Sequence, residues 1–202
     1  MFLRFSVLIP DSISLIKQRT ILGIDPGTNI LGFGIISVNG AGKPEFLDMG
    51  VVDLRKEKDA YSKLAAISAK VGALCEQYHP DDLAIESPFY AKNAQVIFKL
   101  GRAQGAAIVA ASQRGIPVTE YAPRKAKIAI CGNGAASKEQ VAMIVEKTLG
   151  IDIQPSFLDA TDALAIALCH FYQISSPLAS GNSSSGSWEK FIEANPSRVK
   201  NK

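Results

Sequence analysis

The sequence predicts an α/β protein in which helices cover a mixed β-sheet. Three strand-length apolar segments lead the chain, and helical and strand patterns alternate after them, which is typical of layered α/β folds. The 202 residues, 47% of them hydrophobic, suffice for one well-packed domain. We expect this domain at residues 20–173, between a poorly ordered N-terminal extension (1–19) and a flexible Ser/Gly-rich C-terminal tail (174–202).

The first three strands are predicted at TILGID (20–25), LGFGIISV (31–38) and EFLDMGVV (45–52). Asn39-Gly40 between the second and third segments indicates a hairpin turn. The expected sheet therefore begins with neighbouring antiparallel strands.

Helices and two more strands are predicted to follow in alternation. Apolar residues recur every three or four positions from Leu64 to Tyr78, DLAIE (82–86) is a short buried strand, and an Ala- and Gly-rich helix runs from about 93 to 114. A further strand is expected at 117–122. A helix then starts after Ser137, where Gln140 completes a capping box, and ends at Gly150; the last helix begins near Asp159.

Four carboxylates stand where these apolar segments end or begin. Asp25 closes the first strand, Glu86 closes DLAIE, and Asp159 and Asp162 are three residues apart, which places them on one face of a helix. Clustered acids repel one another and need a cation, and ligands that offer only oxygen suit Mg²⁺ or Mn²⁺. The pattern favours a two-metal nuclease.

Each acid also has a purely structural explanation. Asp25 in GIDPGT is compatible with a hydrogen-bonded turn, and acids in the first turn of a helix, such as Asp159 and Asp162, can cap it. GIDPGT is also similar to the phosphate loop of sugar-kinase and actin-type ATPases. Those proteins carry a second Asp-Gly-Gly loop and an adenosine-binding glycine motif, which this sequence lacks, so the nuclease is favoured.

The distribution of charge and the three cysteines further limit the class of protein. The net charge is only +3, but the stretch from Tyr90 to Lys147 has nine basic residues and three acids, which is compatible with a phosphate-facing stripe or with ordinary solvated helix faces. The three cysteines lack zinc-site spacing and are expected to be free thiols in a reducing cytoplasm. We expect no membrane span and no signal peptide.

The GIDPGT, IES-PF-AKNA, KLGRAQGAAIVAA and DATDALAIA segments together closely resemble the RuvC family of bacterial Holliday-junction resolvases, of the RNase H-like, retroviral-integrase-like superfamily. The resemblance covers nearly all of residues 20–173. It implies a three-layer RNase H-like fold with a mixed five-stranded sheet flanked by helices. Ser87 and Pro88 depart from many relatives, which puts the conformation of the following loop in doubt.

The resemblance assigns catalytic and metal-binding roles to Asp25, Glu86, Asp159 and Asp162. It also implies that Phe89 stacks on an unpaired or distorted base, worth about 1–3 kcal/mol. The other implied DNA-binding residues are Lys92, Asn93, Lys127 and Lys138. His170 lies eight residues after Asp162, roughly 12 Å along a helix, so we expect a core or interface histidine instead of a catalytic one.

We therefore expect two Mg²⁺ ions per subunit, with Mn²⁺ as a possible substitute, Asp25 bridging them, and hydrolysis that leaves 5′-phosphate and 3′-hydroxyl ends. The two-fold symmetry of a four-way junction favours a homodimer, with the small-residue helix at 93–114 as its candidate interface. The resemblance implies a branch-migration helicase as a further partner. Alternatives are an RNase H-like nuclease acting on RNA–DNA hybrids, a catalytically silent junction-binding module and a small ATPase.

Overall fold

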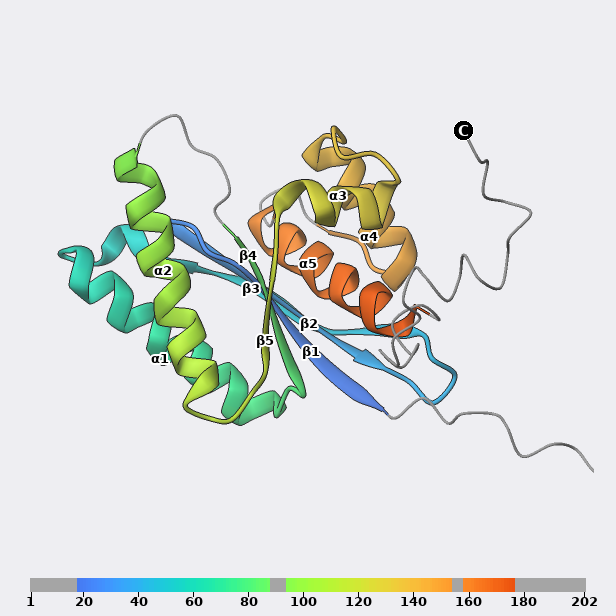
Figure 1. Cartoon of the computed structure of the whole chain (residues 1–202), viewed down its shortest axis with the longest axis horizontal. Helices are drawn as coiled ribbons and strands as arrows, with labels where there is room; N and C mark the ends of the chain where they lie inside the picture. Colours follow the sequence, from blue (N-terminus) through green and yellow to red (C-terminus); the bar gives the residue numbers. More distant parts are fainter. Residues whose placement is uncertain (1–17, 88–93, 154–157, 177–202) are drawn as a thin grey trace, which may run out of the picture.

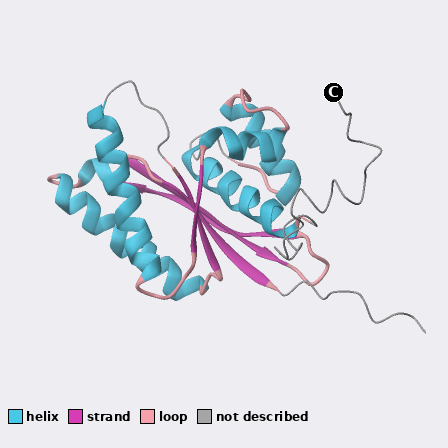
Figure 2. Cartoon of the chain, viewed as in Figure 1, coloured by secondary structure: helices cyan, strands magenta, loops and turns pink. Residues whose placement is uncertain are grey.

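The computed structural model describes residues 18–87, 94–153 and 158–176 and shows a twisted sheet between two layers of helices (Figures 1 and 2). The extension predicted at 1–19 and the tail predicted at 174–202 lie almost entirely outside the described residues. So does the loop at 88–93, with Phe89, Lys92 and Asn93. None of the helices in the described part of the chain combines the length and apolar character that a membrane crossing requires.

The sheet has five strands in the order β3-β2-β1-β4-β5, and it is mixed, as predicted. The strands are β1 (Arg19–Asp25), β2 (Ile30–Val38), β3 (Pro44–Asp53), β4 (Asp82–Glu86) and β5 (Val118–Tyr121). The first three strands pair antiparallel, whereas β4 lies parallel to both β1 and β5. The carboxyl ends of β1 and β4 therefore meet at one edge of the sheet.

Helices cover both faces of the sheet (Figure 1). On one face, α1 (Ala60–Tyr78) and α2 (Ala94–Ser112) pack over apolar side chains of β1, β2 and β4 in one buried cluster. On the other face, α5 (Leu158–Ser175) lies on the sheet, with α3 (Pro123–Cys131) and α4 (Lys138–Leu149) outside it. A 3-10 turn, η1 (Leu54–Lys56), links β3 to α1. This is the expected three-layer arrangement.

The hairpin between β2 and β3 forms as predicted, but its turn is longer than the Asn39-Gly40 pair suggested. Asn39 donates its backbone N–H to the Lys43 carbonyl at 2.9 Å, and its side-chain oxygen accepts from the N–H groups of Ala41 and Lys43. Gly42 has φ 72°, where a side chain would be strained. Asn39 thus organises the turn and Gly42 supplies the left-handed residue.

The sequence-based prediction missed the helix α3. Only Ala126 of its nine residues is buried, and Ile130 and Cys131 pack partly against the core. The apolar side of this short helix is thus limited to a few residues, which gives the helical period little length in which to repeat. Its ends were nevertheless marked, because Pro123 occupies the first helical position and Gly132 ends the helix in the left-handed conformation at φ 69°. Pro123 and Gly132 are therefore the residues from which this helix could have been predicted.

Two glycines let α5 lie directly against the strands. A Cβ on Gly23 would be 2.1 Å from the carbonyl oxygen of Ala163, and one on Gly32 would be 2.0 Å from that of Asp159. Contacts this close exclude any side chain at these two positions. The backbone of α5, including Asp159, is thereby held against β1 and β2.

His170 lies in the core near the other end of α5, as expected from its distance to the acids. It is 4% exposed, and its Nδ1 is 2.8 Å from the Tyr121 hydroxyl. Its Nε2 is 3.6 Å from a carboxylate oxygen of Asp82 and has no hydrogen-bond partner within the described residues. Burial lowers its pKa, which favours the neutral imidazole.

Candidate active site

The fold brings together acids that are far apart in the sequence. Asp25 is the last residue of β1 and Glu86 the last residue of the parallel neighbour β4, with Ile24 and Ile85 paired just before them. Since parallel strands end at the same edge, both carboxylates belong to one side of the sheet. The first turn of α5 supplies Asp159 at this edge, and Asp162 follows on the same helix face.

Three of the four carboxylates form a compact group. Asp25, Asp159 and Asp162 each offer an oxygen, and these oxygens all lie within 4.8 Å of one another. Glu86 is outside that tightest group but is close enough to raise the pKa of Asp25. The geometry therefore shows a three-acid core with Glu86 beside it.

The electrostatics of the site show an excess of negative charge. Burial, followed by repulsion from Glu86 and Asp162, raises the pKa of Asp25 to about 8. Burial and then Asp162 raise the pKa of Glu86 to about 7. The pKa of Asp162 is also raised, mainly by burial. Without a cation, these groups resist carrying their full negative charge together.

Lys138 supplies part of the missing positive charge. Its Nζ makes an ion pair with Asp162 and lies 3.6 Å from an oxygen of Asp159. Burial acts to lower the pKa of Lys138. The hydrogen bond to Asp162 and the negative charges of Asp162, Asp25 and Asp159 together outweigh it, so the net shift of the pKa is upward. Lys138 is the first residue of α4, and the Ser137–Gln140 capping box defines where that helix starts. The sequence placed Lys138 facing DNA and did not predict its contact with the acids.

Lys127, the other predicted basic residue in the described part, has a different setting. Its Nζ donates to the Ala136 carbonyl at 2.7 Å, which ties α3 to the loop before α4. Its charge still acts to lower the pKa values of Glu86 and Asp162. Lys127 thus lies within electrostatic reach of the acids without pairing with them.

The turn after Asp25 has a support that sequence analysis missed. The Nζ of Lys63, on α1, donates to the Thr28 carbonyl at 3.0 Å and to the Asn29 side-chain oxygen at 3.2 Å. A Cβ on Gly27 would collide with the Ile30 carbonyl at 1.8 Å, so the turn is tight. No local pattern around Lys63 indicated this role, because the contact spans 35 residues.

The acidic group could bind a metal ion. Its donors are carboxylate oxygens alone, the donor type that Mg²⁺ and Mn²⁺ prefer. The raised pKa values and the single lysine at the cluster indicate negative charge that a divalent cation would compensate. The residues present fit such an ion.

Comparisons with known proteins identify relatives of the whole described domain. A family model described as crossover junction endodeoxyribonuclease RuvC matches residues 21–170. The protein of that name from Bacteroides fragilis is 51% identical over 187 residues, covering 92% of this chain and 98% of the relative. The one from Christiangramia forsetii is 50% identical over 184 residues, covering 91% and 94%.

Solved structures agree with these sequence matches. Thermus thermophilus RuvC in complex with a Holliday junction substrate is 36% identical with a TM-score of 0.68, over 76% of this chain and 94% of that one. A second Thermus thermophilus RuvC structure is 38% identical with a TM-score of 0.67 over the same shares. The match confirms the predicted α/β, RNase H-like fold.

Proposed function

Since the chain belongs to the RuvC family of crossover junction endodeoxyribonucleases, we propose that it resolves four-way DNA junctions by metal-dependent hydrolysis at the acidic cluster. The observation that carries this proposal is the convergence of Asp25, Asp159 and Asp162, whose oxygens lie within 4.8 Å of one another at the end of the sheet. Asp25 lies 134 and 137 residues before the other two in the sequence, and the site raises the pKa values of Asp25 and Glu86.

We propose that Asp25, Glu86, Asp159 and Asp162 would hold two Mg²⁺ ions per subunit, for which Mn²⁺ can substitute. The ions would supply an activated water and neutralise charge on the leaving 3′ oxygen. The carboxylates would hold the ions, whose positive charge would offset the repulsion between these acids and the DNA phosphate. The products would be 5′-phosphate and 3′-hydroxyl ends.

The basic residues have separate proposed roles. When a cation takes over the charge of Asp159 and Asp162, the Lys138 ammonium becomes available for a DNA phosphate. Lys127 extends positive charge beside it. Family resemblance supports base stacking by Phe89 and backbone contacts by Lys92 and Asn93.

We propose that the molecule acts as a homodimer through α2. Phe98 and Val109 on this helix are 71% and 52% exposed, and the positions of Gly101 and Gly105 between them open onto free space. Spacings of three and four residues put all four on one helix face. An apolar face with small residues suits close packing against a second copy.

The family resemblance also supports residues 20–173 as the nuclease domain, a cytoplasmic location and a branch-migration helicase as partner.

The test compares end-labelled substrates: a four-way junction with a mobile core, a linear duplex of the same sequence and an RNA–DNA hybrid. Each is incubated with the protein in Mg²⁺ and in EDTA. We expect paired nicks in opposite strands of the junction, in Mg²⁺ alone. Preferential cleavage of the hybrid, or junction binding with no nick in Mg²⁺, would refute the proposal.

A further inference from the structure

A groove of about 540 Å³ lies next to the turn that follows Asp25. Three parts of the chain line it: Gly27 to Asn29 of the turn, the segment from η1 into the first half of α1, and Lys99 to Ala103 of α2. None of the four acids of the candidate active site lines it. Its size is in the range of about 300–1,000 Å³ that is typical of ligand-binding clefts.

The groove has an excess of free positive charge. Four basic residues line it and two acids do, Glu57 and Asp59. Asp59 is already used, because one of its oxygens accepts from the backbone N–H groups of Tyr61 and Ser62 at the start of α1. Of the bases, Lys63 is bound to the turn. The remaining three, Lys58, Lys99 and Arg102, are exposed and make no ion pair within the described ranges.

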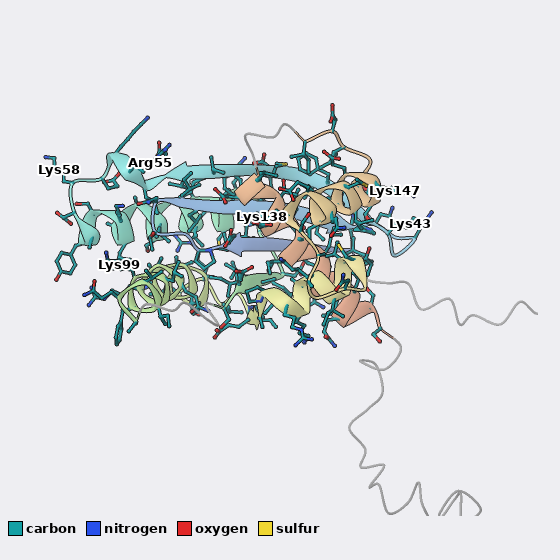
Figure 3. All side chains as sticks on the ribbon, turned by 90° about the horizontal axis from the view of Figure 1, so that it is seen from above. Lys43, Arg55, Lys58, Lys99, Lys138 and Lys147 are labelled. Atoms are coloured by element: carbon teal, nitrogen blue, oxygen red, sulfur yellow. The ribbon has the colours of Figure 1, made fainter. Side chains whose placement is uncertain are left out.

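The groove and the acids are neighbours along the backbone. Gly27 and Thr28 follow Asp25 by two and three residues, so they lie within roughly 10 Å of it even if fully extended. Lys58 and Lys99 lie at one end of the molecule, with Lys138 between them and the opposite end (Figure 3). A strand whose phosphate sits at the acids would thus meet the groove within a few nucleotides.

We propose that this groove binds the sugar–phosphate backbone of the DNA strand beside the scissile phosphate, with Lys58, Lys99 and Arg102 contacting its phosphates. The cations are spread along an open groove and do not converge on one buried point, which suits a chain of phosphates better than a single free anion. This inference rests on the proposed junction-cleaving function and adds a surface outside the acidic cluster.

The test is the salt dependence of junction binding, measured in EDTA so that no strand is cut. The double variant Lys58→Gln/Lys99→Gln is compared with Lys43→Gln/Lys147→Gln, which removes the same charge. Lys43 and Lys147 lie at the opposite end of the molecule (Figure 3). Each lost phosphate contact lowers the slope of log K against log salt by about 0.9. The proposed dimer brings two grooves to one junction, so the groove variant loses four contacts. We expect a drop of about 3.6 for the groove variant and none for the control.

Between 50 and 200 mM salt, the junction affinity of the wild type should fall ~150-fold more than that of the groove variant, by the same slope. An unchanged slope, or an equal drop in both variants, would overturn the inference. A change of sedimentation mass in the groove variant alone would also overturn it, because a second copy would then cover the groove. Wild-type junction cleavage in Mg²⁺ is measured alongside: its absence refutes the proposed function, whereas its presence with an unchanged slope refutes only the groove.

Discussion

Asp25 occupies a position that suits metal binding but makes its ionisation in the folded protein unfavourable. It ends a central strand, where Asp25 pairs with Gly32 of β2 and the preceding Ile24 pairs with Ile85 of β4. Burial and the neighbouring Glu86 and Asp162 oppose its ionisation and raise its pKa to about 8. A metal ion can strongly stabilise the charged form of a carboxylate whose ionisation is opposed in this way.

Asp25→Asn is therefore expected to abolish cleavage and retain junction binding. The amide keeps the size of the side chain but removes the charge shared with Asp159 and Asp162. The single-turnover rate in Mg²⁺ should fall at least about 100-fold, a loss of about 2.7 kcal/mol in transition-state stabilisation. Binding in EDTA should be unchanged. Asp152→Asn, an exposed acid after α4, is the matched control; cleavage by Asp25→Asn at the control's rate would exclude the assignment.

The raised pKa values also predict how stability depends on pH. Between the ordinary Asp pKa of 3.8 and the folded value of about 8 for Asp25, the folded protein keeps a proton that the unfolded chain has lost. The metal-free protein should consequently lose stability as pH rises through 7 to 8.5. Glu86, with a pKa of about 7, acts in the same direction at lower pH.

The measurement is the urea midpoint in EDTA at pH 7.0 and 8.5. We expect the wild type to unfold at lower urea at pH 8.5, Asp25→Asn to lose most of this difference, and Mg²⁺ to restore the wild-type midpoint. Above pH 7 the buried His170 adds little, because its lowered pKa lies below that window. A midpoint that rises with pH in the wild type would contradict the cause assigned to these shifts.

At the scale of elements, the site depends on how closely α5 approaches the sheet. Asp159 and Asp162 face Asp25 because β1 and β2 carry glycine where the α5 backbone touches them. The same helix packs its length against β1, β2 and β4 in one buried cluster. A change that moved α5 away from the sheet would separate Asp159 and Asp162 from Asp25.

Gly32→Ala tests this dependence. The added methyl would start 2.0 Å from the Asp159 carbonyl oxygen, so the first turn of α5 must shift. We expect a loss of about 1–3 kcal/mol in the free energy of unfolding. Mn²⁺ affinity, measured by titration calorimetry, should fall as well. Gly40→Ala, where no atom lies within 4 Å, should change neither quantity; metal affinity equal to wild type in Gly32→Ala would show that α5 does not position the acids.

Sequence reasoning identified most elements because their patterns are local. The strand bounds agree to within one or two residues, DLAIE agrees fully, and the Ser137–Gln140 capping box is present. The helix α3 was missed because it is short and only Ala126 of its residues is buried. The Lys138–Asp162 ion pair and the Lys63 support of the turn join segments 24 and 35 residues apart, and such contacts leave no periodic signal.

At the scale of the whole molecule, the proposed cleavage, DNA-binding and dimerisation roles belong to three different surfaces. The acids meet at one end of the sheet, the basic groove lies beside them, and the outer side of α2 carries exposed apolar residues. The three cysteines take no part in these surfaces and are free. Under the proposed function a junction needs two matched nicks, and we expect a second copy of the chain to present the second acidic cluster.

Phe98→Glu/Val109→Glu is expected to yield a monomer. Both side chains lie on the exposed side of α2, and charges there cannot be buried against a second copy without a large cost. Sedimentation velocity at micromolar concentration should show half the wild-type mass, with an unchanged thermal midpoint. Met143→Glu, an equally exposed apolar residue on α4, should leave the mass unchanged. A monomeric wild type would contradict the dimer.

The most direct test of the central claim is to locate a metal ion at the acids. Crystals of the wild-type protein soaked in Mn²⁺ and measured at the manganese absorption edge give an anomalous map that identifies the ligands. We predict a peak in contact with Asp25 and at least one of Asp159 and Asp162, with the Lys138 ammonium moved away from it. A map with no peak at the cluster, or with Mn²⁺ bound only elsewhere, would contradict the claim that these carboxylates form the catalytic metal site.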